Sequence, residues 1–177
     1  MDNIKTETAT VVYLVDGDNV YLSKKKSNVH TSDGKDLKHS AVWNGYGGKA
    51  ESLDTNILVT ATRELKEESG VDAVESDLIS AGDLKFFWPG NDTENANMHV
   101  HFYILKSWKG EPVETETMEE PRVFGIKDIP YETMMPADQI FMPRMLSGEK
   151  VRGSVYFGKK DEKGVPLFIE NNSLVVK

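Results

Sequence analysis

Three glutamates stand close together in the stretch "RELKEESGV", residues 63–71. Glu64, Glu67 and Glu68 are spaced i, i+3 and i+4, so a helix would place their carboxylates on one face. Like charges at this spacing destabilise a helix by about 0.2–0.5 kcal/mol per pair. A divalent cation would turn this repulsion into binding, and ligands made only of oxygen suit Mg²⁺ or Mn²⁺ better than zinc. The alternative interpretation is a solvated acidic helix face.

A glycine-rich stretch, "WNGYGGK" at residues 43–49, precedes the expected helix. Glycines allow the backbone of such a loop to approach a ligand closely. We expect the helix to have its N-cap at Asp54 or Thr55, to continue to about Ser69 and to end at Gly70, a typical C-cap residue. The neighbouring helix face carries apolar residues that should enter the core, namely Leu58, Ala61 and Leu65.

Strands dominate the rest of the chain. Apolar and β-branched runs on both sides of "DGDN", residues 16–19, predict a β-hairpin. The further expected elements are a polar loop at 27–40, strands at 78–88, 98–105 and 121–126, a short helix at 136–146 and a closing hairpin at 151–170. Pro143 should end or kink the short helix. Strands with only two helices indicate an α+β fold, in which one mixed β-sheet packs against helices.

Length, charge and composition narrow the class of protein. The 177 residues are expected to form a single domain, residues 1–177. The net charge of -8 argues against a face that binds a nucleic-acid polymer, although a single nucleotide is compatible with it. The absence of cysteine excludes disulfides and thiolate chemistry. Because no signal-like leader and no apolar run of about 18 residues occur, we expect a cytoplasmic protein that has no membrane partner.

The glycine loop and the glutamates together resemble the signature of the Nudix hydrolases. That signature is Gly, five residues, Glu, seven residues, then Arg-Glu-aliphatic-x-Glu-Glu-x-Gly-aliphatic. Gly48 opens it here and "RELKEESGV" closes it with every defining position matched, but the stretch between Gly48 and Arg63 is one residue longer than the pattern. As a result Asp54 or Thr55 stands where the first Glu is expected. The resemblance implies the Nudix fold, an α/β/α sandwich, and hydrolysis of a nucleoside diphosphate linked to another group with Mg²⁺ or Mn²⁺.

Roles for the signature residues follow from the resemblance. Glu64, Glu67 and Glu68 would be metal ligands, and Glu67 or Glu68 would also be the base for the attacking water. Arg63 would hold the end of the helix by pairing with carboxylates, and Gly48 would lie beside the metal. In the simplest alternative, Arg63 makes an ordinary helical ion pair.

A further acid outside the signature often joins the metal site in this family. The stretch "ETETMEEP", residues 114–121, supplies three candidates. Glu119 is taken as the metal ligand, while Glu116 and Glu120 stay open. Acidic loops are usually only solvated, which is the alternative for all three.

Most of the chain further resembles the 8-oxo-dGTP diphosphatase branch of the MutT-like proteins. "WNGYGGK" and the segment "GEPVETETMEEPRVFGIKDIPYETMMPADQIFMPRML" carry this likeness. It implies a purine pocket that consists of Thr10, Lys25, Asn44, Phe86, Met98, Met135 and Asp138. Each residue has a simpler alternative: Phe86 and Met98 could be core, Asn44 could bond turn backbone, and Lys25 could be a solvated strand end.

Two departures from that branch affect the expected substrate. Met135 stands where the branch has Trp, and Ala137 replaces the first of two acids, so that only Asp138 remains. We expect Mg²⁺-dependent hydrolysis of a purine nucleoside triphosphate, oxidised or modified, to the monophosphate and pyrophosphate, which implies sanitation of the nucleotide pool by a monomer or homodimer. The alternatives are a Nudix hydrolase for a nucleotide sugar or dinucleotide, and a non-catalytic nucleotide-binding module.

A pair of histidines lies outside these motifs. His99 and His101 alternate along an expected strand and should face the same side of a sheet. That spacing suits metal ligands. Because no third histidine lies nearby in the sequence, a structural role is favoured.

Overall fold

A mixed β-sheet forms the centre of the protein. The structure, a computed structural model, describes residues 6–26, 42–87, 96–160, 166–169 and 175–176. Its strands are β1 (Glu7–Asp16), β2 (Asn19–Lys24), β3 (Trp43–Asn44), β4 (Ile79–Phe87), β5 (Met98–Leu105), β6 (Arg122–Gly125), β7 (Val151–Lys160), β8 (Pro166–Ile169) and β9 (Val175–Val176). The helices are α1 (Ile57–Ser69) and α2 (Asp138–Leu146), with 3-10 turns η1 (Glu75–Asp77), η2 (Ile126–Asp128) and η3 (Tyr131–Thr133).

The strand order confirms that the sheet is mixed. Its main path runs β3-β2-β1-β5-β4-β7-β8, with β6 paired to β2 and β9 paired to β7. β1 is parallel to β5 and β4 is parallel to β7, whereas the other pairs are antiparallel. The hairpins predicted around "DGDN" and near the C-terminus are present as β1–β2 and β7–β8. The polar loop predicted at 27–40 lies outside the described residues.

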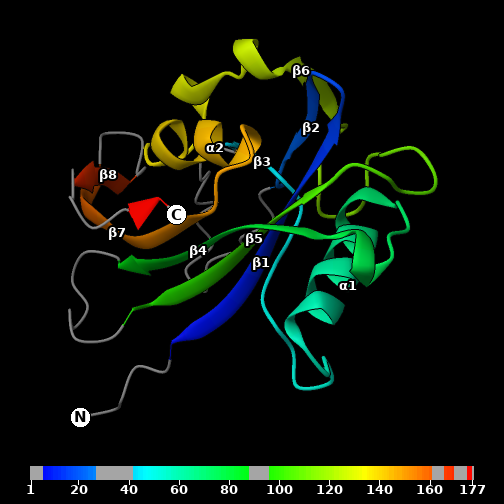
Figure 1. The fold of residues 1–177 in the computed structure, drawn as a ribbon, viewed down its shortest axis with the longest axis horizontal. Helices are drawn as coiled ribbons and strands as arrows, with labels where there is room; N and C mark the ends of the chain where they lie inside the picture. The colour runs from blue at the N-terminus through cyan, green and yellow to red at the C-terminus, as the bar shows by residue number, and fades with distance from the viewer. Residues whose placement is uncertain (1–5, 27–41, 88–95, 161–165, 170–174, 177) are drawn as a thin grey trace, which may run out of the picture.

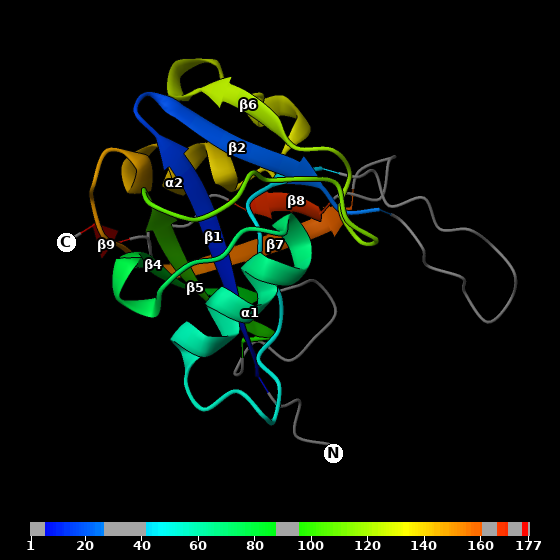
Figure 2. The same cartoon turned by 90° about the vertical axis from the view of Figure 1, so that its right-hand side faces the viewer.

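The two helices cover opposite faces of this sheet (Figure 1). Side chains on β1 alternate between two buried clusters, as the period of two residues in a strand requires. Tyr13 and Val15 belong to the cluster that contains α2 residues, and Val12 and Leu14 belong to the cluster that contains α1 residues. Figure 2, turned toward α1, shows that helix lying in front of β1 and β5. The predicted α+β arrangement, with helices on both sides of one mixed sheet, is therefore confirmed.

Helix α1 begins one or two residues later than predicted. Its N-cap is Asn56, whose side-chain oxygen accepts hydrogen bonds from the backbone N–H groups of Leu58 and Val59 at 2.8 and 3.2 Å. The N-cap predicted at Asp54 or Thr55 is wrong, because Asn56 supplies the cap and leaves Asp54 free for another partner. The predicted C-cap is confirmed: Gly70 has a φ of 77°, in the left-handed region that glycine favours.

The expectation was that Pro143 would end or kink α2, and its first part is wrong, because the helix continues through Pro143 to Leu146. Phe141, Met142 and Met145 are buried against the sheet, and this packing offsets the hydrogen bond that proline cannot donate. Gly82 on β4 lies directly beneath this helix, since a Cβ there would lie 2.2 Å from the Met145 Cε. Among the described residues no helix has the length and apolar character needed to cross a bilayer.

Candidate active site

The three glutamates of α1 lie together, as their spacing predicts. Their side chains differ in environment: Glu68 is 4% exposed as a residue, Glu64 is largely buried, and the Glu67 side chain is 58% exposed. All three line one cavity of about 410 Å³, and the rest of its lining is Lys25, Thr115, Glu116 and Thr117. The gradient from buried to exposed carboxylates gives the cavity a closed end at Glu68 and an open end at Glu67.

Glu68 is held at the closed end by two polar contacts. The backbone N–H of Gly47 donates to its Oε2 at 2.7 Å, and the Lys25 Nζ lies 3.2 Å from its Oε1. Burial raises the pKa of Glu68 above its usual value, although the Gly47 N–H and the Lys25 charge oppose that effect. A buried carboxylate with a raised pKa is poised to gain from a nearby cation, which would replace its lost hydration.

The glycine-rich loop runs beside β1 as if it were another strand. The Val12 N–H donates to the Tyr46 carbonyl at 2.7 Å, and the Thr10 N–H donates to the Gly48 carbonyl at 2.9 Å. A Cβ on Gly47 would lie 2.0 Å from the Thr10 carbonyl oxygen, so only glycine permits this pairing. Two glycines in this loop therefore bring its backbone against β1 and against the glutamates.

Gly48 leaves space for a carboxylate. A Cβ at this position would lie 2.4 Å from the Glu64 Oε2. We expect Gly48→Ala to lower kcat at least about 10-fold, because a displacement of about 1 Å at a reacting site can cost about 100-fold. The Glu64 side chain can rotate away, so the midpoint of thermal unfolding should change little. Steady-state kinetics and thermal unfolding by circular dichroism measure the two effects.

The neighbouring glycine provides the contrast for this test. At Gly47 the added methyl would meet backbone rather than the end of a side chain, so Gly47→Ala should lower the unfolding midpoint. Ser52, an exposed residue just beyond this loop, supplies a neutral control as Ser52→Ala. Wild-type kcat in Gly48→Ala would show that the position of Glu64 beside this glycine does not matter for turnover.

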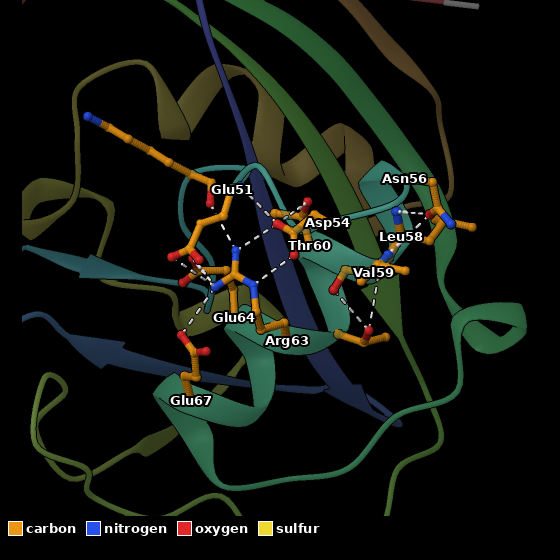
Figure 3. A network of polar contacts seen from close by, with 11 residues as sticks. Glu51, Asp54, Asn56, Leu58, Val59, Thr60, Arg63, Glu64 and Glu67 are labelled. Atoms are coloured by element: carbon orange, nitrogen blue, oxygen red, sulfur yellow. Dashed lines mark hydrogen bonds and ion pairs between the residues drawn. The ribbon is translucent and has the colours of Figure 1, made fainter.

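Arg63 organises the acidic residues around it (Figure 3). Its Nη1 donates to Glu64 at 2.9 Å and to Glu67 at 3.2 Å. Its Nη2 donates to the Lys49 carbonyl at 3.1 Å. One guanidinium thus fixes two glutamates of the cavity and ties them to the glycine-rich loop, which is more than an exposed helical ion pair would do.

Asp54 completes this network. It accepts from Arg63 Nε at 3.0 Å and from Nη2 at 2.8 Å, and it also accepts from the Glu51 N–H and the Thr60 hydroxyl, both at 2.9 Å. The hydrogen bond from Arg63, followed by the one from the Glu51 N–H, holds the pKa of Asp54 well below its usual range. The same pair raises the pKa of Arg63. Asp54 therefore braces the stretch of chain that leads into the helix.

The candidate glutamates of the loop at residues 114–121 line two different cavities. Glu116 lines the same cavity as Glu64, Glu67 and Glu68. Glu119 lines a neighbouring cavity, together with Lys24, Trp43, Glu120, Pro121 and Arg122. The Glu119 backbone is fixed by β2, because its N–H donates to the Lys24 carbonyl at 2.8 Å and its carbonyl accepts from the Ser23 hydroxyl at 2.6 Å. Among the three loop glutamates, Glu116 therefore shares the cavity of the helix glutamates, and Glu119 as a metal ligand stays a prediction.

Four of the expected purine-pocket residues gather on the α2 side of the sheet. Phe86 is opposite Met98 in the β4–β5 pair, and Met98 and Met135 pack against the buried cluster that contains Phe86. Phe86 itself is 8% exposed and contacts the rings of Phe102, Phe141 and Phe157. It is a core residue, as the simpler alternative predicts.

Asp138 is the buried acid of this group. Its carboxylate accepts from the Met135 N–H at 3.1 Å. Burial raises the pKa of Asp138 to about 7, while the Met135 hydrogen bond acts in the opposite direction. Burial, followed by the charge of Asp138, also raises the pKa of Tyr13, whose hydroxyl finds no hydrogen-bond partner within the described part of the chain. Tyr13 was not among the predicted residues, although its inward position follows from the alternation of β1.

The remaining expected pocket residues lie elsewhere. Thr10 alternates with Val12 and Leu14, so its side chain points to the α1 face, opposite to Phe86. The Asn44 side-chain oxygen accepts from the Gly45 N–H at 2.8 Å, the turn contact that the simpler alternative predicts. Lys25 lies at Glu68. The structure thus does not bring Thr10 to the α2-side group, and it places Lys25 with the carboxylates.

His99 and His101 share one sheet face, as predicted, and Asp83 joins them from β4. The His99 Nε2 contacts the Asp83 carboxylate, and the His101 Nδ1 lies 3.9 Å from the Asp83 Oδ2. Burial and the neighbouring His99 lower the pKa of His101. No third histidine lies close to this pair in the sequence, but the strand pairing supplies an acid that sequence spacing alone could not place.

The glutamate cavity has the donors that a hard divalent cation requires. Its acidic oxygens come from one helix face and one loop, and Gly48 leaves space beside Glu64. Glu68 is nearly buried with a raised pKa, so a cation would relieve an existing cost. The cavity thus combines carboxylate oxygens, which a hard divalent cation prefers as ligands, with one basic side chain, Lys25.

Comparison with known structures shows where this fold occurs. A MutT protein from Bacillus halodurans is 18% identical, with a TM-score of 0.65 over 96% of this chain and 97% of that one. A MutT protein from Methanosarcina mazei is 14% identical, with a TM-score of 0.62 over 84% and 97%. An ADP-ribose pyrophosphatase from Streptococcus suis is 18% identical, with a TM-score of 0.53 over 84% and 98%. At these identities the likeness shows the fold.

Family membership comes from the sequence match. No curated protein matches the chain. The NUDIX domain family matches residues 5–145, which include the glycine-rich loop, the helix with the three glutamates, and the segment up to α2. The chain therefore belongs to the Nudix family of hydrolases and has the fold of its MutT-like members.

Proposed function

We propose that this protein hydrolyses a purine nucleoside triphosphate, oxidised or modified in its base, to the monophosphate and pyrophosphate. The observation that carries the proposal is the cavity at Glu64, Glu67 and Glu68, closed at Glu68 and lined by Lys25. Nudix hydrolases act on nucleotide substrates and generally use a divalent metal. Mg²⁺ is the proposed cofactor and Mn²⁺ is the alternative, because the proposed ligand atoms are all carboxylate oxygens, which these hard cations prefer.

The metal would be held by the three glutamates of α1. Glu116 is the candidate for a further ligand from the loop, and the backbone near Gly48 would lie beside the metal. When bound, it supplies charge neutralisation of the diphosphate and activation of the attacking water. Arg63 keeps Glu64 and Glu67 in position, because one nitrogen donates to both. Preorganisation of this kind is a large part of catalysis in phosphoryl transfer.

A carboxylate of the protein would accept the proton of the attacking water. Glu67 or Glu68 would take a proton from the attacking water. The oxygen of that water would bond to phosphorus while the anhydride bond to the leaving pyrophosphate breaks. Lys25, the basic residue in the lining of the cavity, would pair with a phosphate oxygen.

Base recognition is assigned to the α2 side of the sheet. Met98 and Met135 are partly buried at the edge of the core cluster and can lie against the flat face of a purine. Asp138, with a pKa of about 7, holds its proton near neutrality and can donate to an acceptor on the purine edge or accept from a donor. Asn44 is retained as a further candidate through the amide nitrogen of its side chain.

A second substrate class has support of its own. Met135 and Ala137 replace the ring and the acid that the 8-oxo-dGTP diphosphatase branch carries. The fold is also that of an ADP-ribose pyrophosphatase from Streptococcus suis. Hydrolysis of a nucleotide sugar or a dinucleotide at the same glutamates is therefore the alternative. A non-catalytic binding module would have no need of the arginine-braced glutamates.

A nucleotide panel separates these activities. The protein is incubated with Mg²⁺ and 8-oxo-dGTP, the ordinary purine triphosphates, ADP-ribose and a dinucleoside polyphosphate, and products are identified by chromatography and mass. Pyrophosphate and a monophosphate from a purine triphosphate are expected. Turnover restricted to ADP-ribose or dinucleotides would replace the proposed substrate, and tight binding without product from any nucleotide would contradict hydrolysis. Glu67→Gln is the matched control for contaminating phosphatases.

A further inference from the structure

A cluster of two histidines and one aspartate lies on the sheet outside the glutamate cavity. Asp83 comes from β4, and His99 and His101 come from β5. The antiparallel register places Asp83 directly opposite His101, while alternation puts all three side chains on the same face. Their metal-binding atoms lie within 4.8 Å of one another. The strand pairing alone therefore brings together three metal-ligand types from two strands.

The spacing is close to that of a metal site. Ligands at about 2.0–2.1 Å from a tetrahedral Zn²⁺ lie about 3.3 Å apart. The His101 Nδ1 and the Asp83 Oδ2 are 3.9 Å apart, the His99 Nε2 already contacts Asp83, and the two imidazole rings have centroids 4.5 Å apart. Small side-chain rotations would bring all three atoms onto one ion, without movement of the strands.

The three side chains are accessible from solvent. Their exposed fractions are 41% for Asp83, 27% for His99 and 25% for His101. Asp83 and His99 line a cavity of about 480 Å³, together with Lys85, Arg152, Gly153 and Ser154. An ion could therefore enter, and at least one coordination position would stay open toward this cavity.

The charges around the cluster decide which ion it would take. Lys85 and Arg152 line the same cavity, and Arg152 is opposite Asp83 in the β4–β7 pair. Two cations beside one carboxylate disfavour Mg²⁺ or Ca²⁺, which rely on several anionic oxygens. Imidazole nitrogens instead favour a transition metal such as Zn²⁺. The same two cations would favour a small anion as the remaining ligand.

The geometry points to a second metal site in this protein, a Zn²⁺-type site held by Asp83, His99 and His101, distinct in its residues from the glutamate cavity. The simpler explanation is a hydrogen bond between His99 and Asp83 alone. That explanation gives no part to His101, whereas the metal site requires it. His101 is therefore the residue that separates the two explanations.

Zinc binding in the presence of competing magnesium tests the site. Metal-free full-length protein is dialysed against Zn²⁺ with a large excess of Mg²⁺, and the bound zinc is measured by mass spectrometry and calorimetry. Wild-type protein should bind one equivalent. His101→Gln and Asp83→Asn should each weaken that binding at least about 100-fold, since even residues that only orient a metal ligand are worth about 10- to 100-fold.

The matched control is Glu67→Gln, which changes the glutamate cavity and should bind zinc as the wild type does. Absence of bound zinc in wild-type protein, or unchanged binding in His101→Gln, would overturn the site. Zinc lost in Glu67→Gln but kept in His101→Gln would do the same. If a variant fails to fold, the anomalous signal of zinc in a soaked wild-type crystal decides: a peak between Asp83, His99 and His101 supports the site, and its absence contradicts it.

Discussion

Glu68→Gln and Glu67→Gln are each expected to lower kcat at least about 100-fold while the protein stays folded. An amide keeps the shape of the carboxylate but removes the charge that binds a cation and the basic oxygen that takes a proton. Gln at position 68 can still accept from the Gly47 N–H, and the Glu67 side chain is 58% exposed. Both variants should therefore unfold near the wild-type temperature.

The two variants should also differ in metal dependence. Glu67 lies at the open end of the cavity and Glu68 at its closed end, so their loss should affect the affinity for Mg²⁺ to different extents. The Mg²⁺ concentration that saturates each variant should therefore be measured before the kcat values are compared. Glu75→Gln, on the 3-10 turn η1, removes an acid outside the cavity and should leave kinetics unchanged. Near-normal rates in both glutamate variants at saturating Mg²⁺ would remove these residues from the mechanism.

Stability should fall as the pH rises from about 4 to about 7, because of Asp138. Burial raises the pKa of Asp138 to about 7 in the folded protein, whereas the unfolded value is near 3.8. Within this window only the folded state holds the proton, so the stabilisation is complete below about pH 4 and is lost as the pH passes through 7. The free energy of unfolding should fall by about 4 kcal/mol across this pH range.

Asp138→Asn isolates this effect because an amide does not titrate. The free energy of unfolding is measured by urea denaturation from pH 4 to pH 8 in both proteins, and the difference between them is compared at each pH. Wild-type protein should lose about 4 kcal/mol relative to Asp138→Asn across the window. Glu132→Gln, an exposed neighbour on η3, is the control. A difference that does not change with pH would show that the folded state does not hold the proton of Asp138.

Local periodicity explains what was predictable. The glutamates share one face because a helix repeats every 3.6 residues, and the same period places Ala61 and Leu65 in the core. Gly70 ends the helix because its left-handed φ suits glycine. The shared face of His99 and His101 follows from the period of two in strands. Each of these features depends on residues close together in the chain.

Features that depend on partners distant in sequence could not be predicted. The N-cap of α1 is Asn56 rather than the predicted Asp54, because the Asp54 side chain binds Arg63, nine positions further along the chain. Glu116 rather than Glu119 reaches the glutamate cavity because β2 fixes the backbone of the latter. The contact between Asp83 and the histidines depends on the β4–β5 register, which the sequence does not specify.

The central claim is that Glu64, Glu67 and Glu68 bind a divalent cation against the phosphates of a nucleotide. The direct measurement is a crystal structure with Mn²⁺ and a non-hydrolysable purine triphosphate, in which the anomalous signal locates the metal. We expect a manganese peak coordinated by these carboxylates and by phosphate oxygens. A bound nucleotide with no manganese at the three glutamates would contradict the account.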